Sequence, residues 1–218
     1  MNIIMYLVDF IINIDKHLLE IIQIFDLWSY AILFLIVFVE TGIVIFPFLP
    51  GDSLLFASGA FAAKDAFNIV VLILLFFAAA VLGDTVNYHI GKKAGTSISR
   101  NKFMNKVINQ EKMEKAESFF NKHGGKTIVM ARFMPFIRTF IPFIAGVSHM
   151  NYRAFIAYNI VGGALWVTLC TVAGYFFGNL PIVQENFSLF IILIIIISLL
   201  PAIFTYLKNK FTVERTLK

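Results

Sequence analysis

Charged side chains are scarce in this sequence. Asp, Glu, Lys and Arg make up 14% of the 218 residues, hydrophobic residues make up 59%, and the mean hydropathy is +0.83. Soluble domains carry about a quarter charged and about half apolar residues. The deficit of charge excludes an ordinary soluble domain and predicts an all-α integral membrane protein that forms one domain.

Cysteine and histidine are also rare. The single cysteine, Cys170, lies in an apolar run, so the chain has no disulfide framework and its cysteine content says nothing about the compartment. His89, His123 and His149 do not have the spacing of metal ligands, and we expect no metal and no cofactor. The N-terminus lacks a basic region and a small-residue cleavage site, so we expect no removable signal peptide.

The basic residues gather in two places. Nine of the eighteen Lys and Arg residues fall between Lys92 and Lys126, and four more lie in the tail, residues 208–218. Basic loops beside membrane spans stay in the cytoplasm. The distribution predicts a multi-pass protein of the cell membrane with a cytoplasmic central loop and C-terminus, and it argues against a nucleic-acid partner.

The apolar stretches divide the single membrane domain, residues 1–218, into six predicted parts. These are an amphipathic N-terminal helix (1–27), a broken segment with a span (28–91), the basic loop (92–126), a second broken segment with a span (127–178), a final span (187–207) and the basic tail (208–218). The two broken segments with their spans form a weak internal repeat. Because the loop between them is basic, the first segment enters from outside and the second from inside. This predicts an inverted-topology repeat with two facing re-entrant helical hairpins.

Proline and glycine set the predicted breaks in the two hairpins. Proline lacks a backbone N–H and clashes with the preceding helical turn, so one straight helix is not expected in either segment. The predicted breaks are Pro47, Pro50, Gly51, Pro135, Pro142 and Gly146.

The two hairpins carry charges of opposite sign. Glu40 and Asp52 flank the first break, and Arg132 and Arg138 lie at the second. An isolated charge near the bilayer centre costs about 2.5–3.5 kcal/mol, so four unpaired charges would cost roughly 10 kcal/mol. We therefore expect the four to face one another, with the arginines holding a phosphate and the carboxylates pairing with them or exchanging protons. Buried structural ion pairs are the alternative.

The spans contain a second set of polar residues. They are Asp84, Asn87, Tyr88 and Asn159. Hydrogen bonding between packed helices explains such residues as well as a functional role does. Gly162, Gly163 and Gly174 predict a small-residue face for close packing of the second span.

Four segments within residues 28–178 together resemble the DedA family, which is related to eukaryotic VTT-domain proteins. They are ETG…FPFLPGD at 40–52, GDTVNYHIGKKAG at 83–95, ARFMPFIRTFIPFIAG at 131–146, and the pattern of Phe155, Asn159, Gly162, Gly163 and Trp166. In that family an acidic pair and an arginine pair in these motifs are functionally important, and they correspond to Glu40, Asp52, Arg132 and Arg138.

The resemblance implies a protein that moves polyprenyl phosphates or phospholipids across the membrane. We favour a flippase for undecaprenyl phosphate, coupled to protons, over an enzyme. The alternatives are a phosphatidylethanolamine or phospholipid translocase or scramblase, a polyprenyl pyrophosphate phosphatase using Ser53 or Thr139, and a structural or regulatory membrane protein. The expected partners are the lipid, the membrane and protons, and a homodimer is left open.

The charge distribution generates a topology prediction. Cysteines introduced as Lys106→Cys and Lys210→Cys, each in a Cys170→Ala background, should resist a membrane-impermeant thiol reagent in intact cells and react after permeabilisation. Labelling of either cysteine from outside would contradict the inverted repeat.

Overall fold

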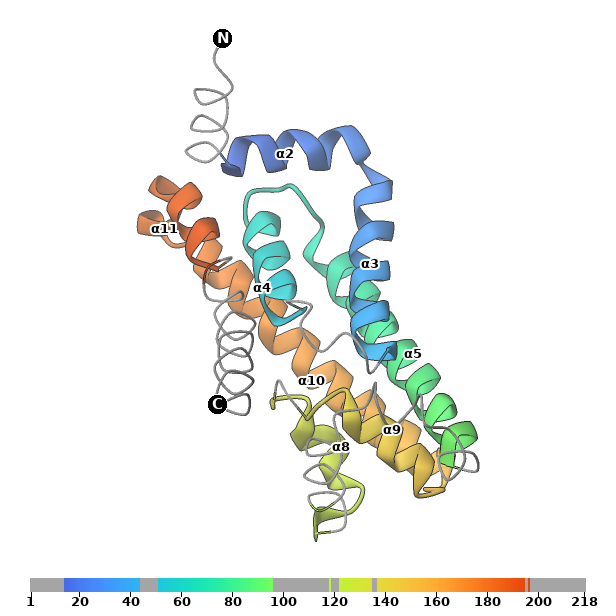
Figure 1. Ribbon diagram of the computed structural model, residues 1–218. Coiled ribbons are helices and arrows are strands. Elements are labelled where there is room, and N and C mark those ends of the chain that lie inside the picture. The colour runs from blue at the N-terminus through green and yellow to red at the C-terminus, as the bar shows by residue number, and fades with distance from the viewer. Residues whose placement is uncertain are drawn as a thin grey trace, which may run out of the picture. The chain divides into compact units, whose positions relative to one another are not determined.

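The computed structural model describes residues 14–43, 51–95, 118, 122–134, 137–194 and 196 (Figure 1). All regular structure among these residues is helical, which confirms the all-α prediction for this part of the chain. The helices are α2 (Ile14–Phe25), α3 (Leu27–Gly42), α4 (Gly51–Ala62), α5 (Ile69–Gly95), α8 (Lys126–Ala131), α9 (Phe140–Val147), α10 (Tyr152–Gly178) and α11 (Pro181–Glu185). Residues 187–194 are also helical.

Among the residues that the structure describes, two helices, α5 and α10, are long and apolar enough to cross a bilayer. Spanning the hydrocarbon core takes about 20 residues, and these helices fall mostly in the later parts of the two segments predicted to contain a span, 28–91 and 127–178. Most of the final predicted span, the basic loop and the tail lie outside the described residues.

Both broken segments contain two helices separated by a break, as predicted. In the first, α3 ends at Gly42 and α4 begins at Gly51, and Pro47 and Pro50 between them lie outside the described residues. In the second, α8 ends at Ala131 and α9 begins at Phe140. The re-entrant course of these segments through a membrane stays a prediction.

The second break differs in position from the prediction. Pro142 and Gly146 lie inside α9 and do not interrupt it, and Pro135 falls outside the described residues. Pro142 is the third residue of α9, in the first turn, where a missing N–H costs no helical hydrogen bond. The break lies between Ala131 and Phe140, and its described residues, 132–134 and 137–139, are not helical.

The described residues group into two compact units, which we describe separately. The first takes its residues from Met1–Ser29, Pro50–Ile69 and Cys170–Lys218. Within it, Gly59 of α4 faces the backbone of Thr171, and Gly174 of α10 faces the backbone of Phe56, so these two helices touch through their glycines. Phe61 meets the edge of the Phe187 ring at a centroid distance of 5.4 Å.

The second unit takes its residues from Tyr30–Leu49 and Val70–Leu169. It contains most of α3 and α5, all of α8 and α9, and the first part of α10, and α8 and α9 contact each other. Its core joins side chains from four helices: Tyr88, Ile128, Ala131, Phe140, Ile141, Ile144, Ala145 and Phe155. Tyr88 stacks on Phe155 at 4.5 Å between centroids, and its hydroxyl donates to the Met150 carbonyl.

Glycines let α9 lie directly on α5 in the second unit. Gly146 of α9 faces the Tyr88 carbonyl, and Gly91 of α5 faces the Phe143 carbonyl. A Cβ atom at either position would overlap backbone atoms, which cannot rotate away as a side chain can. The contact therefore fixes the distance between the two helices.

We predict that Gly146→Ala and Gly91→Ala each destabilise the protein by about 1–3 kcal/mol, the usual cost of overpacking a close contact. The measurement is the thermal midpoint of the purified protein in detergent. Gly42→Ala is the matched control, because its added Cβ would lie 3.4 Å from the nearest atom, an ordinary contact. Equal midpoints for all three variants would show that α5 and α9 are not held by this contact.

Candidate functional site

Two ion pairs are buried among the described residues of the second unit. The Arg132 guanidinium donates to the Asp84 carboxylate, and the Arg138 guanidinium donates to the Glu40 carboxylate. The four residues are only 6%, 5%, 9% and 3% exposed, respectively. Taking a charge out of water costs several kcal/mol, and a paired opposite charge can offset about that much. Charges are therefore seldom buried this deeply unless they are paired.

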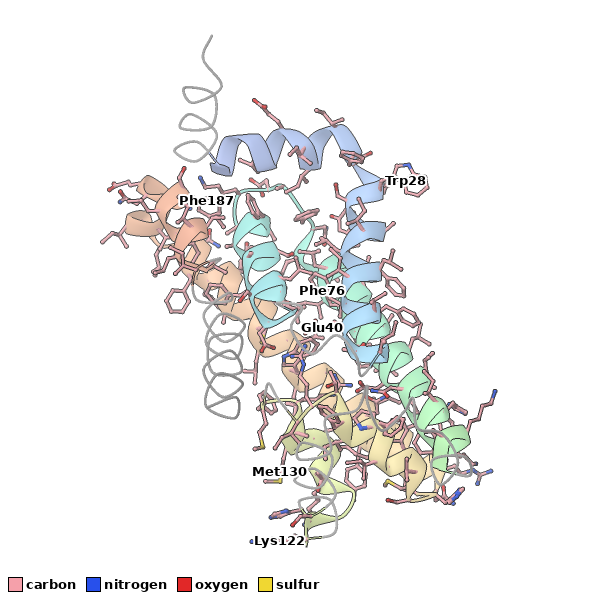
Figure 2. All side chains as sticks on the ribbon, viewed as in Figure 1. Trp28, Glu40, Phe76, Lys122, Met130 and Phe187 are labelled. Atoms are coloured by element: carbon pink, nitrogen blue, oxygen red, sulfur yellow. The ribbon has the colours of Figure 1, made fainter. Side chains whose placement is uncertain are left out.

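The elements of the fold bring these four charges together. Glu40 lies in the last turn of α3, close to its C-terminal end in Figure 2, and Asp84 lies within α5. Arg132 follows α8 directly, and Arg138 lies two residues before α9, so the second break supplies both arginines. As expected, Glu40 forms an ion pair with one of the two arginines, Arg138. The carboxylate paired with Arg132 is that of Asp84.

Asp52 occupies a different setting from the other predicted charges. It lies in the first turn of α4, in the first unit, and its side chain is exposed. A carboxylate in that position is favourable for the helix because it faces the positive end of the helix dipole. Its role as a proton-coupling partner of the arginines stays a prediction.

Asn87 connects the first broken segment to the second. Its side-chain amide donates to the Thr41 carbonyl at 3.2 Å and to the Thr139 carbonyl at 2.7 Å. Thr41 lies in the last turn of α3, and Thr139 ends the second break. Both amide hydrogens of this buried residue are used, so Asn87 fixes the positions of two backbone segments that flank the ion pairs.

Asn159 and two glycines of α10 position the side chain of Arg132. Asn159 accepts a hydrogen bond from the guanidinium and donates to the Val81 carbonyl at 3.1 Å. A Cβ atom at Gly162 would lie 3.0 Å from Arg132 Cδ, and one at Gly163 would lie 3.6 Å from a guanidinium nitrogen. These glycines leave room for the arginine side chain, which is a more specific role than the predicted close packing of helices.

Trp166 lies beside both guanidinium groups. The centre of its ring is 4.7 Å from Arg138 Cζ and 5.9 Å from Arg132 Cζ. A guanidinium within about 6 Å of an indole ring is attracted to its electron-rich face. One buried aromatic ring thus helps to hold two groups of like charge near each other.

A small pocket lies beside the ion pairs. It is lined by Thr41, Asp84, Arg132, Arg138, Thr139 and Trp166. The cavity volume is about 10 Å³, room for about one water molecule. A phosphate group therefore enters the pocket only when the surrounding side chains move apart. When ionised, the two arginines are balanced by Glu40 and Asp84, so the pocket is formally neutral.

The ion pair of Asp84 with Arg132 was not expected from the sequence, and neither was a place for Trp166 and Thr41 in the site. One signal was available. Asp84, Asn87, Tyr88 and Gly91 follow the spacing i, i+3, i+4, i+7, which places all four on one face of α5. A carboxylate on such a face inside an apolar span indicates a buried cationic partner. No group of three or more metal-ligating side chains occurs among the described residues.

The fold and the site define a class, a helical membrane protein with a buried pocket of paired arginines and carboxylates, and the comparisons define the family. The VTT domain family matches residues 49–176. Protein DedA of Escherichia coli strain K12 is 48% identical over the full length of both chains. The chain therefore belongs to the DedA family of VTT-domain proteins.

Further relatives are named as membrane proteins. Uncharacterized membrane protein ML0287 of Mycobacterium leprae strain TN is 44% identical over 84% of this chain and 82% of its own. Inner membrane protein YqjA of Escherichia coli strain K12 is 37% identical over 70% of this chain and 69% of its own. No solved structure matches the chain. The predicted membrane location fits these relatives.

The ion pairs generate a test by double-mutant cycle. Asp84→Asn should destabilise the protein by about 3–5 kcal/mol, because it leaves the buried Arg132 without a counter-charge. Asp84→Asn combined with Arg132→Gln should be more stable than Asp84→Asn alone, because the orphaned charge is gone. Thermal unfolding in detergent measures both. Additive effects of the two substitutions would contradict the pairing.

Proposed function

We propose that this protein carries lipids with a phosphate headgroup across the cell membrane, and that undecaprenyl phosphate is its substrate. The observation that supports the proposal is the buried pocket lined by Arg132, Arg138 and Asp84, where Arg138 is also paired with Glu40. Guanidinium groups bind phosphate oxygens through two parallel hydrogen bonds, and they keep their charge at every physiological pH.

The pocket also suggests how protons are coupled to the lipid. An arriving phosphate competes with Glu40 and Asp84 for the same guanidinium donors, because both arginines already donate to these carboxylates. A phosphate that displaces a carboxylate brings excess negative charge into a buried place. Uptake of a proton by the displaced carboxylate restores neutrality, so phosphate binding and proton binding occur together.

The course of the chain belongs to the same proposal. Two facing re-entrant hairpins, with the central loop and C-terminus in the cytoplasm, would let the phosphate reach the arginines from either side in turn, as in transporters built from inverted repeats. Non-helical backbone at membrane depth is tolerated where it lines a polar cavity, and the stretch from Arg132 to Thr139 contributes three residues to the pocket lining.

The test is transport of a labelled polyprenyl phosphate in vesicles that contain the purified protein, with and without an imposed pH gradient. Wild-type rates should respond to the gradient. Arg132→Lys and Arg138→Lys should each lower the rate at least about tenfold, because lysine cannot donate in the two-pronged geometry. Glu40→Gln should be slow or indifferent to the gradient, because an amide cannot take up the proton.

Arg153→Lys provides the matched control. Arg153 lies on α10, the helix that contributes Trp166 to the pocket, but its side chain is exposed, so this variant should transport at the wild-type rate. Near-full rates for the Lys variants at positions 132 and 138 would contradict the phosphate site. A wild type that ignores the gradient, together with normal transport by Glu40→Gln, would remove the proton role and leave the carboxylates as structural partners.

A further inference from the structure

Thr139 is a lining residue of the pocket, and its hydroxyl is one that the protein itself does not use. The side chain is buried, and Oγ1 has no hydrogen-bond partner among the described residues. A buried hydroxyl without a partner costs free energy, because it has given up its hydrogen bonds to water. Such a group in a native structure needs an explanation.

Two other threonines of the same unit, the buried Thr41 and the half-buried Thr85, show how a helical threonine hydroxyl usually finds a partner. Thr41 Oγ1 donates to the Val37 carbonyl at 2.9 Å, and Thr85 Oγ1 donates to the Val81 carbonyl at 2.7 Å. Both follow the common pattern in which a helical threonine bonds to the carbonyl four residues earlier. Thr139 departs from this pattern.

The sequence around Thr139 explains why its hydroxyl is not used as a helix cap. Thr139 is the N-cap residue of α9, yet it makes no side-chain capping bond. An N-cap threonine normally accepts a hydrogen bond from the N–H of the second or third helical residue. Here the third residue is Pro142, which has no N–H, and the N–H of the second, Ile141, already donates to the Ile137 carbonyl.

Arg132 contributes a second unused donor to the pocket. Its NH2 group donates to Asp84 and Asn159, but its buried Nε–H has no hydrogen-bond partner among the described residues. Thr139 is itself held in place, because its carbonyl accepts the 2.7 Å bond from Asn87. A fixed hydroxyl and a fixed N–H are therefore available in one small pocket.

An unused hydroxyl is not by itself a sign of a ligand. Thr171, in the first unit, is equally buried and also has no partner for Oγ1 among the described residues. What distinguishes Thr139 is its place in the lining of a pocket that has two arginines. This difference makes Thr171 a matched control.

We propose that Thr139 is a specificity-determining residue of the pocket. Its hydroxyl donates a hydrogen bond to a non-bridging oxygen of the bound phosphate group, beside the donor at Arg132 Nε. The ligand chemistry is a phosphate group, carried by a lipid or free in solution. This assignment rests on the proposed function. The Thr139 hydroxyl adds a neutral, directional donor to the charged guanidinium donors of Arg132 and Arg138.

The protein carries its own probe for the test. It has two tryptophans, of which Trp28 is 72% exposed and Trp166, in the pocket wall, is 2% exposed. In a Trp28→Phe background, fluorescence reports on Trp166 alone. The purified protein is titrated in detergent with farnesyl phosphate and, separately, with inorganic phosphate, and calorimetry of the same titrations provides a second readout.

Thr139→Val should weaken binding of farnesyl phosphate about tenfold or more, the loss expected when one hydrogen bond to a charged group is removed. Thr139→Ser keeps the hydroxyl and should bind within about threefold of the wild type. Thr171→Val should bind like the wild type. The thermal midpoint of Thr139→Val should be unchanged or raised, because valine removes an unsatisfied hydroxyl, whereas a structural threonine would lower it.

The two phosphate probes identify the source of the phosphate. Tighter binding of farnesyl phosphate than of inorganic phosphate identifies a lipid site, and equal affinities identify a site for free phosphate, with Thr139→Val weakening both in either case. If Thr139→Val binds like the wild type while Arg132→Gln has lost binding, the role of Thr139 is wrong and the proposed function stands. If the wild type binds neither probe by either readout, the proposed function fails.

Discussion

Burial of two guanidinium groups in an apolar helical unit is the constraint on which the described site depends. Arg132 and Arg138 cannot lose their charge, so each requires an acceptor that has also left water. Asp84 and Glu40 provide these acceptors from two different helices, and Asn159 and Trp166 provide further contacts from a third. Four separate segments therefore meet around these charges, which explains why so many unusual residues occur around a single pocket.

The close contacts of the helices serve the same end. Gly91 and Gly146 bring α5 and α9 to backbone distance, and Gly162 and Gly163 leave space beside α10 for the side chain of Arg132. Asn87 then fixes the last turn of α3 and the end of the second break to α5. These contacts hold the backbone around the pocket, and the charges of the two ion pairs balance.

Thr139 illustrates how a pocket can retain a donor for a ligand. An N-cap hydroxyl usually accepts a hydrogen bond from the N–H of the third helical residue. In α9 that residue is Pro142, which has no N–H, so the Thr139 hydroxyl lacks this donor. The protein accepts a small loss of stability at this point, as functional sites often do. The pattern Thr-x-x-Pro at the start of α9 is thus as informative for the site as the arginines before it.

The sequence by itself determined the helical membrane character, the two long helices, the presence of two breaks and the identity of the arginines. Each of these follows from local properties: apolar length, proline chemistry and the cost of charge in lipid. The inward-facing side of α5 was also readable, from Asp84, Asn87, Tyr88 and Gly91. Only the tertiary structure decided which carboxylate meets which arginine, since Glu40 and Arg138 are 98 residues apart and composition favours no particular pairing. It also decided that Pro142 continues a helix instead of ending one, because the effect of a proline depends on the turn in which it falls.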